Sequence, residues 1–287
     1  MDFKKILAAL SILTAALCSP VIGATNMQDS SSNLDWQVLN QWQLPQSPVD
    51  IVHSLDGKYV FVLTSEHNVL VYTADGKLEG TIPVDKGVNA IDIAPRAEML
   101  YLINGEKNSF TTISVSFIRE INTAGAPIRG PENAPVTIAL FTDFECPYCS
   151  KIEPLIAQVL ERNPKNVRLA FKNMPLQFHK FADPAARAAL AAEKQGKFWE
   201  FHDELFSAEK LSNKVIEDIA VKLDLDLEQW KKDMESPVIR QKVHTDIQDA
   251  QKAGVTGTPT IFINGRLLQD RSLQGFQRII DEELDKK

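Results

Sequence analysis

Hydrophobic and polar positions divide the chain into two regions with different periodicities. From Trp36 to Phe117, short apolar runs alternate with turn residues, which predicts a series of β-strands joined by hairpins. From residue 136 onward, short apolar runs alternate with longer stretches in which apolar residues recur at helical spacing. The runs are 136–141, 167–171, 261–263 and 266–268, and the helical stretches are 152–160, 184–194, 198–205, 215–223, 238–250 and 273–284. We therefore expect a small all-β domain followed by an α/β domain.

The expected domain boundaries follow from this change in pattern. The β-domain covers residues 35–122, and Asp56-Gly57 is one of its predicted hairpin turns. Residues 123–135, rich in glycine and proline, are expected to form a linker and the start of the second domain. The α/β domain covers residues 136–287, with a helical insertion over about 180–250.

The β-domain repeats itself after 40 residues. The matched segments are Tyr59–Val62 with Met99–Leu102, Glu66–Asn68 with Glu106–Asn108, and Trp42 and Leu44 with Ile82 and Val84. This period and the segment Ser54–Val62 resemble the blades of YVTN/NHL-type β-propellers. Two blades cannot close a ring, which takes about four to eight. A self-contained monomeric domain, a domain whose open strand edges are covered by a partner, and a homodimer formed through this region are therefore all open.

Residues 1–24 have the pattern of a secretory signal peptide. The basic pair Lys4-Lys5 precedes the apolar run Ile6–Leu17, and small residues ending at Ala24 form an expected cleavage site. The apolar run is too short for a typical membrane-spanning helix. We expect a periplasmic or otherwise exported protein, cleaved after Ala24.

Cys18 ends that apolar run and raises the alternative of a lipoprotein. Leu17 stands directly before it, where lipoproteins have a small residue, so we do not expect lipidation. The polar residues 25–34 that follow the signal are expected to form a disordered leader.

Composition narrows the possible partners. The 287 residues are 44% hydrophobic, which is enough for two domains with ordinary cores. Their formal charge of −7 argues against a general binder of nucleic acid or of anionic membranes. We expect no nucleic-acid partner.

The candidate chemistry lies in Cys146-Pro147-Tyr148-Cys149, between a predicted strand and a predicted helix. A Cys-x-x-Cys pair in that context is typical of a redox site. Cys146 would lie at the helix N-terminus, where backbone N–H groups and the helix dipole favour a thiolate, and Pro147 fits the first turn. Cys149, one turn further on, could attack a mixed disulfide. A zinc site needs about four ligands, and the only other cysteine is Cys18, so we expect neither a metal nor another cofactor.

A second motif lies more than a hundred residues downstream, in Gly254–Gly265. Thr258-Pro259 directly precedes an apolar run, and Asn264-Gly265 is a typical hairpin turn. Because proline is disfavoured inside a sheet, Pro259 should mark the start of a strand. The bond before proline is also the one at which a cis peptide costs least. We expect a cis-proline loop at Thr258-Pro259.

Three blocks together resemble the DsbA-like branch of the thioredoxin superfamily. They are Phe141–Cys149, Gln195–Asp203 and Gly254–Gly265, in the family's order and spacing. The resemblance covers about residues 126–287 and implies a thioredoxin-like α/β fold with an inserted helical domain. It also implies an exposed nucleophile at Cys146, a buried resolving Cys149, and a cis Pro259 packed against the pair.

Several residues near the pair are expected to adjust its chemistry. Pro147 and Tyr148 tune the redox potential. Because Tyr148 is neutral where a histidine would add positive charge, we expect a couple less oxidising than the DsbA parent, whose potential is about −120 mV. Leu140 stands where many thioredoxin-like enzymes have a buried acid, so proton transfer would fall to water or to Asp143 and Glu145.

Other candidates have a structural interpretation beside a functional one. His179 and His202 could approach the redox site, although a lone histidine is more often a surface or capping residue. Four aromatic residues are expected in the core of the insertion, and the alternative is that an exposed one of them lines a peptide groove. They are Phe198, Trp199, Phe201 and Phe206.

Together these features predict an exported thiol-disulfide oxidoreductase acting on periplasmic proteins with cysteine thiols or disulfides. We favour an oxidase that a membrane redox partner recycles, with Thr258 and Pro259 offering backbone groups to an extended substrate. One alternative is a dimeric isomerase or reductase, because an N-terminal dimerisation module and a threonine before the cis-proline resemble the DsbC-like isomerases. Another alternative is a partner-binding protein in which the β-repeat region carries recognition.

Overall fold

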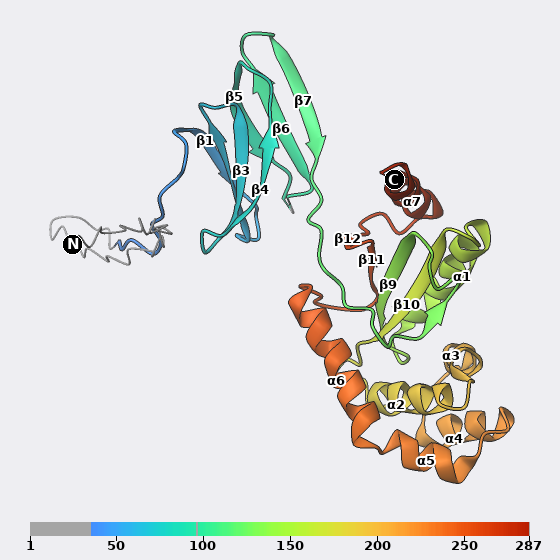
Figure 1. Cartoon of the computed structure of the whole chain (residues 1–287). Coiled ribbons are helices and arrows are strands. Elements are labelled where there is room, and N and C mark those ends of the chain that lie inside the picture. Colours follow the sequence, from blue (N-terminus) through green and yellow to red (C-terminus); the bar gives the residue numbers. More distant parts are fainter. Residues whose placement is uncertain (1–35, 96, 287) are drawn as a thin grey trace, which may run out of the picture. The chain divides into compact units, whose positions relative to one another are not determined.

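A computed structural model describes residues 36–95 and 97–286 of the chain. The predicted signal peptide, Cys18 and the leader up to residue 34 lie outside the described residues. The chain divides into two compact units, one ending at Val115 and one beginning at Ser116 (Figure 1).

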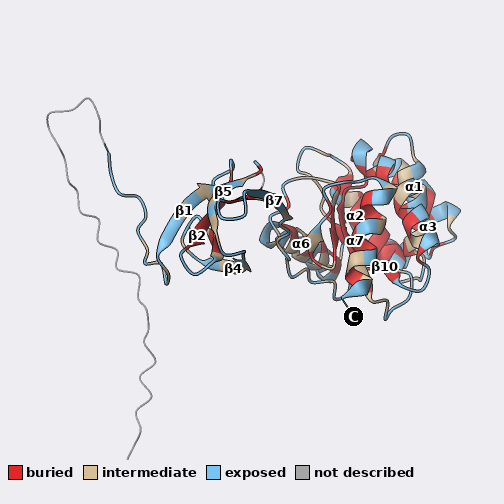
Figure 2. Ribbon diagram, turned by 90° about the horizontal axis from the view of Figure 1, so that it is seen from above, coloured by how far each residue is buried: buried red, intermediate tan, exposed pale blue. Residues whose placement is uncertain are grey.

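The first unit consists of two antiparallel sheets in which consecutive strands are neighbours. One sheet contains β1 (Pro48–His53), β2 (Tyr59–Thr64), β3 (Asn68–Thr73) and β4 (Leu78–Pro83); the other contains β5 (Val88–Ile93), β6 (Met99–Asn104) and β7 (Ser109–Ser114). The predicted turn at Asp56-Gly57 is present, with Gly57 at a φ of 68°. Figure 2 shows the contrast between the buried β2 and the largely exposed β1. The β-strands predicted in this region are confirmed, whereas the resemblance of the two sheets to propeller blades stays a prediction.

The second unit is built on a five-stranded sheet with the order β12-β11-β9-β10-β8. Its strands are β8 (Ile128–Arg129), β9 (Val136–Thr142), β10 (Val167–Asn173), β11 (Thr260–Ile263) and β12 (Arg266–Leu267). The central strands β9 and β10 are parallel, and the other pairs are antiparallel. The parallel pair is joined through a helix, as parallel strands require.

The boundary between the units differs from the predicted one, which lay after residue 122. Ile118 forms a β-bridge with Arg266, and the Arg119 N–H donates a hydrogen bond of 2.8 Å to the Gly265 carbonyl. Gly265 is required here, because a Cβ on it would lie 2.2 Å from the Arg119 carbonyl oxygen. These contacts tie residues 116–122 to the second unit. The predicted linker also contributes strand β8 to this sheet.

Two helices cover one face of this sheet. They are α1 (Pro147–Arg162) and α7 (Leu273–Asp285). The core between them and the sheet includes Ile138 of β9, Ile156 of α1 and Phe276 of α7, all at most 1% exposed. In α1 and α7 the apolar residues recur about every turn, so they lie on one face of each helix, and this face packs against the sheet.

Five helices lie between β10 and β11, over the range in which the sequence predicts a helical insertion. They are α2 (Ala182–Glu193), α3 (Phe198–Ser207), α4 (Asn213–Lys222), α5 (Leu227–Met234) and α6 (Pro237–Lys252). The side chains of Ser212, Asp226 and Ser236 cap the last three by accepting a backbone N–H hydrogen bond. The helices enclose an apolar core that contains Phe201 and Trp230.

A buried charge cluster joins the sheet to the insertion. Lys172, the sixth residue of β10, is completely buried, and its Nζ lies 2.6 Å from an Asp246 carboxylate oxygen and 2.8 Å from one of Asp249. Both aspartates lie on α6, the helix that leads towards the Thr258-Pro259 loop. The cluster therefore fixes the end of β10 to α6.

None of the helices within residues 36–95 and 97–286 combines the length and the apolar character needed to cross a membrane.

Candidate active site

The fold places the Cys-x-x-Cys pair where β9 leads into α1. Cys146 is the N-cap residue of α1, with extended backbone angles, and Pro147 occupies the first turn. The carbonyl of Cys146 accepts hydrogen bonds from the N–H groups of Cys149 (3.0 Å) and Ser150 (3.2 Å). The Cys146 sulfur therefore lies at the positive end of the helix dipole, which stabilises a thiolate.

The structure corrects the expectation that Cys146 is exposed. Only 5% of Cys146 is exposed, and Cys149 is completely buried. The Sγ of Cys146 is 3.7 Å from the Thr258 carbonyl oxygen. The loop that contains Thr258 therefore lies beside the Cys146 sulfur. The exposed residues of the motif are Pro147 and Tyr148, which is 68% exposed.

The loop that contacts Cys146 has the predicted cis peptide bond between Thr258 and Pro259. β11 begins directly after Pro259 and pairs with β9, with Thr260 opposite Phe141. This pairing brings a loop from the end of the chain beside the pair more than a hundred residues earlier. The two motifs that the sequence analysis singled out therefore form one site.

The two thiols differ in their electrostatic surroundings. Burial raises the pKa of the Cys149 thiol to about 12, although the Thr142 and Thr258 hydroxyls act in the opposite direction. At neutral pH, Cys149 therefore retains its proton. The effect of these two hydroxyls on Cys149 did not follow from the sequence, since no sequence motif marks the Thr142 or Thr258 side chain as a partner of this thiol.

This difference predicts an ordered reaction with an alkylating agent. In the reduced chain, we expect iodoacetamide to modify Cys146 well before Cys149. In a Cys146→Ser variant, modification of Cys149 should accelerate by about tenfold per pH unit, because the thiolate fraction grows until the pH reaches the pKa. Peptide mass spectrometry measures both. A Cys149 rate that stops rising below about pH 9, near the pKa of a free thiol, would contradict the burial of this sulfur.

The two carboxylates considered for proton transfer hold the backbone of neighbouring loops. Buried Asp143 accepts hydrogen bonds from the N–H groups of Glu145 (2.7 Å) and Leu176 (2.8 Å). Glu145 accepts one from the N–H of Phe181 at 2.6 Å. Leu140 lies in the apolar core between the sheet and α1. These contacts give both carboxylates a positioning role, and proton transfer at the sulfurs, through water or through these carboxylates, stays a prediction.

The two candidate histidines lie in different surroundings. The Nδ1 atom of His179 is 2.8 Å from the Asp143 carboxylate, three residues before Cys146. His202 is buried among aromatic rings and lies beside Asp203 and Glu153. Burial lowers the pKa of His202, but the two carboxylates raise it, and the net shift is upward. His179 thus joins the loop that borders the pair, whereas His202 belongs to the core of the second unit.

The four aromatic residues of α3 pack as predicted. Phe198 and Phe201 are buried, while Trp199 and Phe206 are partly buried against the same core. The indole N–H of Trp199 also donates a hydrogen bond of 3.0 Å to the Ile128 carbonyl. These side chains anchor α3 and β8.

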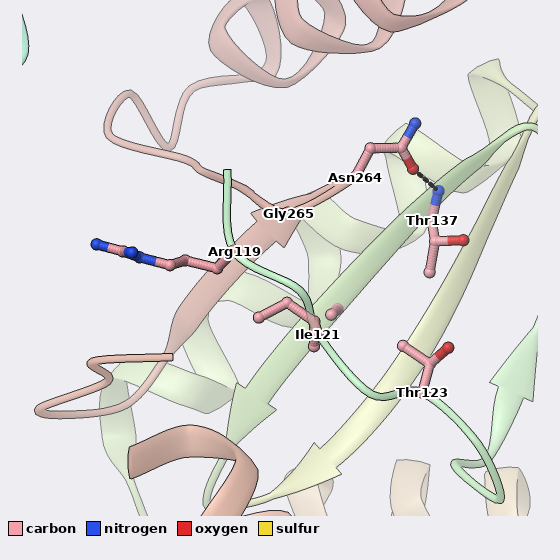
Figure 3. Close-up of a pocket in the computed structure, with 7 residues that line it drawn as sticks. Arg119, Ile121, Thr123, Thr137, Asn264 and Gly265 are labelled. Atoms are coloured by element: carbon pink, nitrogen blue, oxygen red, sulfur yellow. Dashed lines mark hydrogen bonds between the residues drawn. The ribbon is translucent and has the colours of Figure 1, made fainter. Parts of the chain in front are cut away.

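The cavity shown in Figure 3 is separate from the cysteine pair. Its volume is about 190 Å³, and it lies between segment 119–123 and the β9 residues Thr137 and Ala139. The Asn264 side chain also lines the cavity and accepts a hydrogen bond from the Thr137 N–H. Among residues 36–95 and 97–286, no three His, Cys, Asp or Glu side chains are grouped so that they could hold a metal ion.

Comparison with known proteins agrees with this geometry. The sequence profile of the thioredoxin family matches residues 122–282. The probable disulfide bond formation protein D of Bacillus cereus is 34% identical over 170 residues, which cover 55% of this chain and 78% of that protein. A thioredoxin-like oxidoreductase from Silicibacter pomeroyi has a similar structure, with a TM-score of 0.53 and 32% identity over 57% of this chain and 94% of its own.

A further relative is much longer than this chain. The Na(+)/H(+) antiporter NhaA 3 of Salinispora tropica is 39% identical over 141 residues, which cover 48% of this chain and 22% of the antiporter. The chain thus spans under a quarter of that relative. The profile match over more than half of the sequence, together with the Bacillus relative, shows that the chain belongs to the thioredoxin family.

Proposed function

We propose that this protein is an exported thiol-disulfide oxidoreductase that works as an oxidase of protein thiols through Cys146 and Cys149. The observation that carries the proposal is the position of the Cys146 sulfur, at the N-terminus of α1 and 3.7 Å from the Thr258 carbonyl. A relative whose name describes disulfide bond formation supports the oxidising direction.

The first step opens the disulfide of the oxidised pair. A substrate thiolate attacks the Cys146 sulfur, a new disulfide forms between substrate and Cys146, and the electron pair of the old bond goes to the Cys149 sulfur. Cys149 then takes up a proton. Its pKa of about 12 means that it holds this proton at neutral pH, so it returns slowly to displace the substrate.

The second step releases the oxidised substrate. A second substrate thiolate attacks the substrate sulfur of the mixed disulfide, and Cys146 leaves as a thiolate stabilised by the helix dipole. Two substrate thiols have then become one disulfide, and the enzyme pair has gained two electrons. A membrane redox partner would remove these electrons and restore the Cys146–Cys149 disulfide.

Substrate binding is proposed to involve the backbone beside Cys146 and the exposed aromatic rings around it. The Thr258-Pro259 loop offers backbone groups to an extended segment. Tyr148 and Phe178, which is 79% exposed, offer apolar surface. Phe178 stacks edge-on against His179, which in turn contacts Asp143. This surface suits unfolded chains in which cysteines lie among apolar residues.

A disulfide isomerase is the second candidate, because Thr258 stands before the cis-proline as in the DsbC-like isomerases. The two functions differ in the starting substrate. An oxidase forms disulfides in reduced, unfolded ribonuclease when its own pair is oxidised, whereas an isomerase restores activity to scrambled ribonuclease when its pair is reduced. We expect the first reaction to be fast and the second to stay near the rate in buffer. If the protein restored activity to scrambled ribonuclease but did not form disulfides in reduced ribonuclease, the oxidase proposal would be wrong and the isomerase would be the proposed function.

The redox potential should reflect the neutral tyrosine between the cysteines. We expect equilibration with glutathione buffers to give a potential more negative than the approximately −120 mV of the DsbA parent. A Tyr148→His variant should move the potential in the oxidising direction, because a positive charge near the helix N-terminus stabilises the reduced thiolate form. Tyr148→Phe is the neutral control and should leave the potential nearly unchanged. A potential at or above the parent value would contradict this role of Tyr148.

A further inference from the structure

The two sheets of the first unit repeat each other in detail. β5 and β6 lie 40 residues after β1 and β2, and β7 lies 41 residues after β3. The pairing of β1 with β2 shifts register between Pro48 and Asp50, and that of β5 with β6 shifts between Val88 and Ala90. Only the first sheet has a fourth strand, β4, while β7 is the last strand of the second sheet in the described part of the chain.

The chain enters both sheets in the same way. The Ser65 N–H donates to the Ser47 carbonyl at 2.9 Å, and the Gly105 N–H donates to the Gly87 carbonyl at the same distance. The segment before Gly87 comes from β4, the outer strand of the preceding sheet. By the 40-residue repeat, residues 38–43 correspond to β4, and so to the outer strand of a sheet that would precede β1. That sheet is absent from the described part of the chain.

The second sheet exposes a face that is buried in the first sheet. Phe61, Leu63 and Val69 are completely buried. The opposite face of their sheet is covered by Leu44, and β1 and β2 both contact β5, so these three side chains pack towards the second sheet. Their repeat equivalents are Tyr101, Ile103 and Phe110. Ile103 is 46% exposed, Phe110 is 62% exposed, and the rings of Phe110 and Tyr101 stack at 5.9 Å.

The segment that would complete the second sheet is also exposed. Trp36, Val38 and Leu39 are between 43% and 77% exposed and belong to no strand. Further along, Trp42 packs on Tyr72, with ring centroids 6.2 Å apart, and Leu44 packs on the same side of the first sheet. That side is the face turned away from the second sheet. The segment therefore leaves the first sheet on the side where a preceding sheet would lie.

We propose that two copies of this chain close a ring of four sheets, in which residues 38–43 of each copy form the fourth strand beside β7 of the other. The exposed face of Tyr101, Ile103 and Phe110 would pack against the Trp42 side of the second copy's first sheet. Each contact repeats the packing already present between the two sheets of one chain. The ring has two-fold symmetry, which closes the assembly, and four sheets lie within the known range for such rings. An open strand edge favours this kind of pairing.

The repeat fixes the register of the new strand pair. In the first sheet, Leu70 of β3 lies opposite Thr81 of β4. The equivalent residues are Thr111 of β7 and Gln41 of the second copy. Cysteines placed at these two positions should therefore form a disulfide between copies.

The test uses the full mature chain with Cys146 and Cys149 replaced by serine, and with Cys18 replaced if it is retained. We mix a Gln41→Cys chain with a Thr111→Cys chain, add a mild oxidant, and separate the products on a non-reducing gel. The expected product is a covalent heterodimer formed in high yield. Gln37→Cys mixed with Thr111→Cys is the control, because Gln37 lies outside the proposed strand, and it should give little product.

Light scattering on the unmodified chain tests association independently. We expect a dimer that Phe110→Glu weakens by about tenfold or more in Kd, as for a buried aromatic residue at an interface. Leu55→Glu, at a residue that is 80% exposed in a turn, should leave the dimer intact. A chain that stays monomeric at high concentration would overturn the proposal. So would a dimer without the Gln41–Thr111 cross-link, or a cross-link found within a single chain carrying both cysteines.

Discussion

Replacing Cys146 with serine should abolish disulfide transfer to a reduced protein substrate. A serine oxygen cannot form the disulfide that is attacked in the first step, so the remaining cysteine has no partner within the site. We expect the rate to fall by about three orders of magnitude or more, the scale seen when a covalent nucleophile is removed from an enzyme. The measurement is the formation of disulfides in reduced ribonuclease, followed by quenching and mass spectrometry.

Cys149→Ser should have a different effect and serves as the matched comparison. This variant keeps the Cys146 thiolate at the helix N-terminus but lacks the thiol that resolves a mixed disulfide. When it is offered a substrate disulfide, it should therefore accumulate as a covalent adduct through Cys146. Ser150→Ala, in the same turn, should retain full activity. If Cys146→Ser trapped substrate and Cys149→Ser did not, the assigned roles of the two sulfurs would be reversed.

Replacing Lys172 with alanine should strongly destabilise the second unit. Lys172 is completely buried, and its ammonium group lies within 2.8 Å of carboxylate oxygens of both Asp246 and Asp249. Removing it leaves buried negative charge without this partner, a change that typically costs about 3–5 kcal/mol. Lys242, which also contacts Asp246, compensates only in part because it is nearer the surface.

Urea unfolding followed by the far-ultraviolet helical signal measures this loss. The described part of the first unit contains strands and no helix, so the signal reports mainly on the second unit. The matched control is Lys214→Ala, which removes an exposed ion pair with Asp218 on α4 and should change the midpoint little. If Lys172→Ala lowered the free energy of unfolding by less than about 1 kcal/mol, the charge cluster would behave as a solvent-exposed ion pair, which would contradict its burial.

The local features of the site could be predicted from the sequence because short-range chemistry determines them. A proline directly after Cys146, a few residues beyond an apolar strand, predicts the start of a helix at this point. The structure places Cys146 at the N-cap of α1. Asn264 and Gly265 both have positive φ angles, as the predicted turn requires. The predicted cis bond between Thr258 and Pro259 is also present. It could be predicted because the bond before a proline is nearly the only one at which a cis peptide is common.

Features that depend on contacts between distant segments could not be predicted. The burial of Cys146 comes from a loop 112 residues away. Lys172 follows an apolar run, and only the packing of α6 reveals that Asp246 and Asp249 face it rather than solvent. Likewise, the Asp143–His179 contact and the β-bridge of Ile118 join parts of the sequence that share no pattern.

The transfer of a disulfide from Cys146 and Cys149 to a substrate tests the central claim most directly. The fully oxidised chain is mixed with an equal amount of a reduced peptide that contains two cysteines, and both masses are followed after acid quenching. The proposed function predicts that the peptide loses the mass of two hydrogen atoms while the chain gains it, in a ratio of one to one. An oxidised Cys146–Cys149 pair that leaves the peptide unchanged would contradict it.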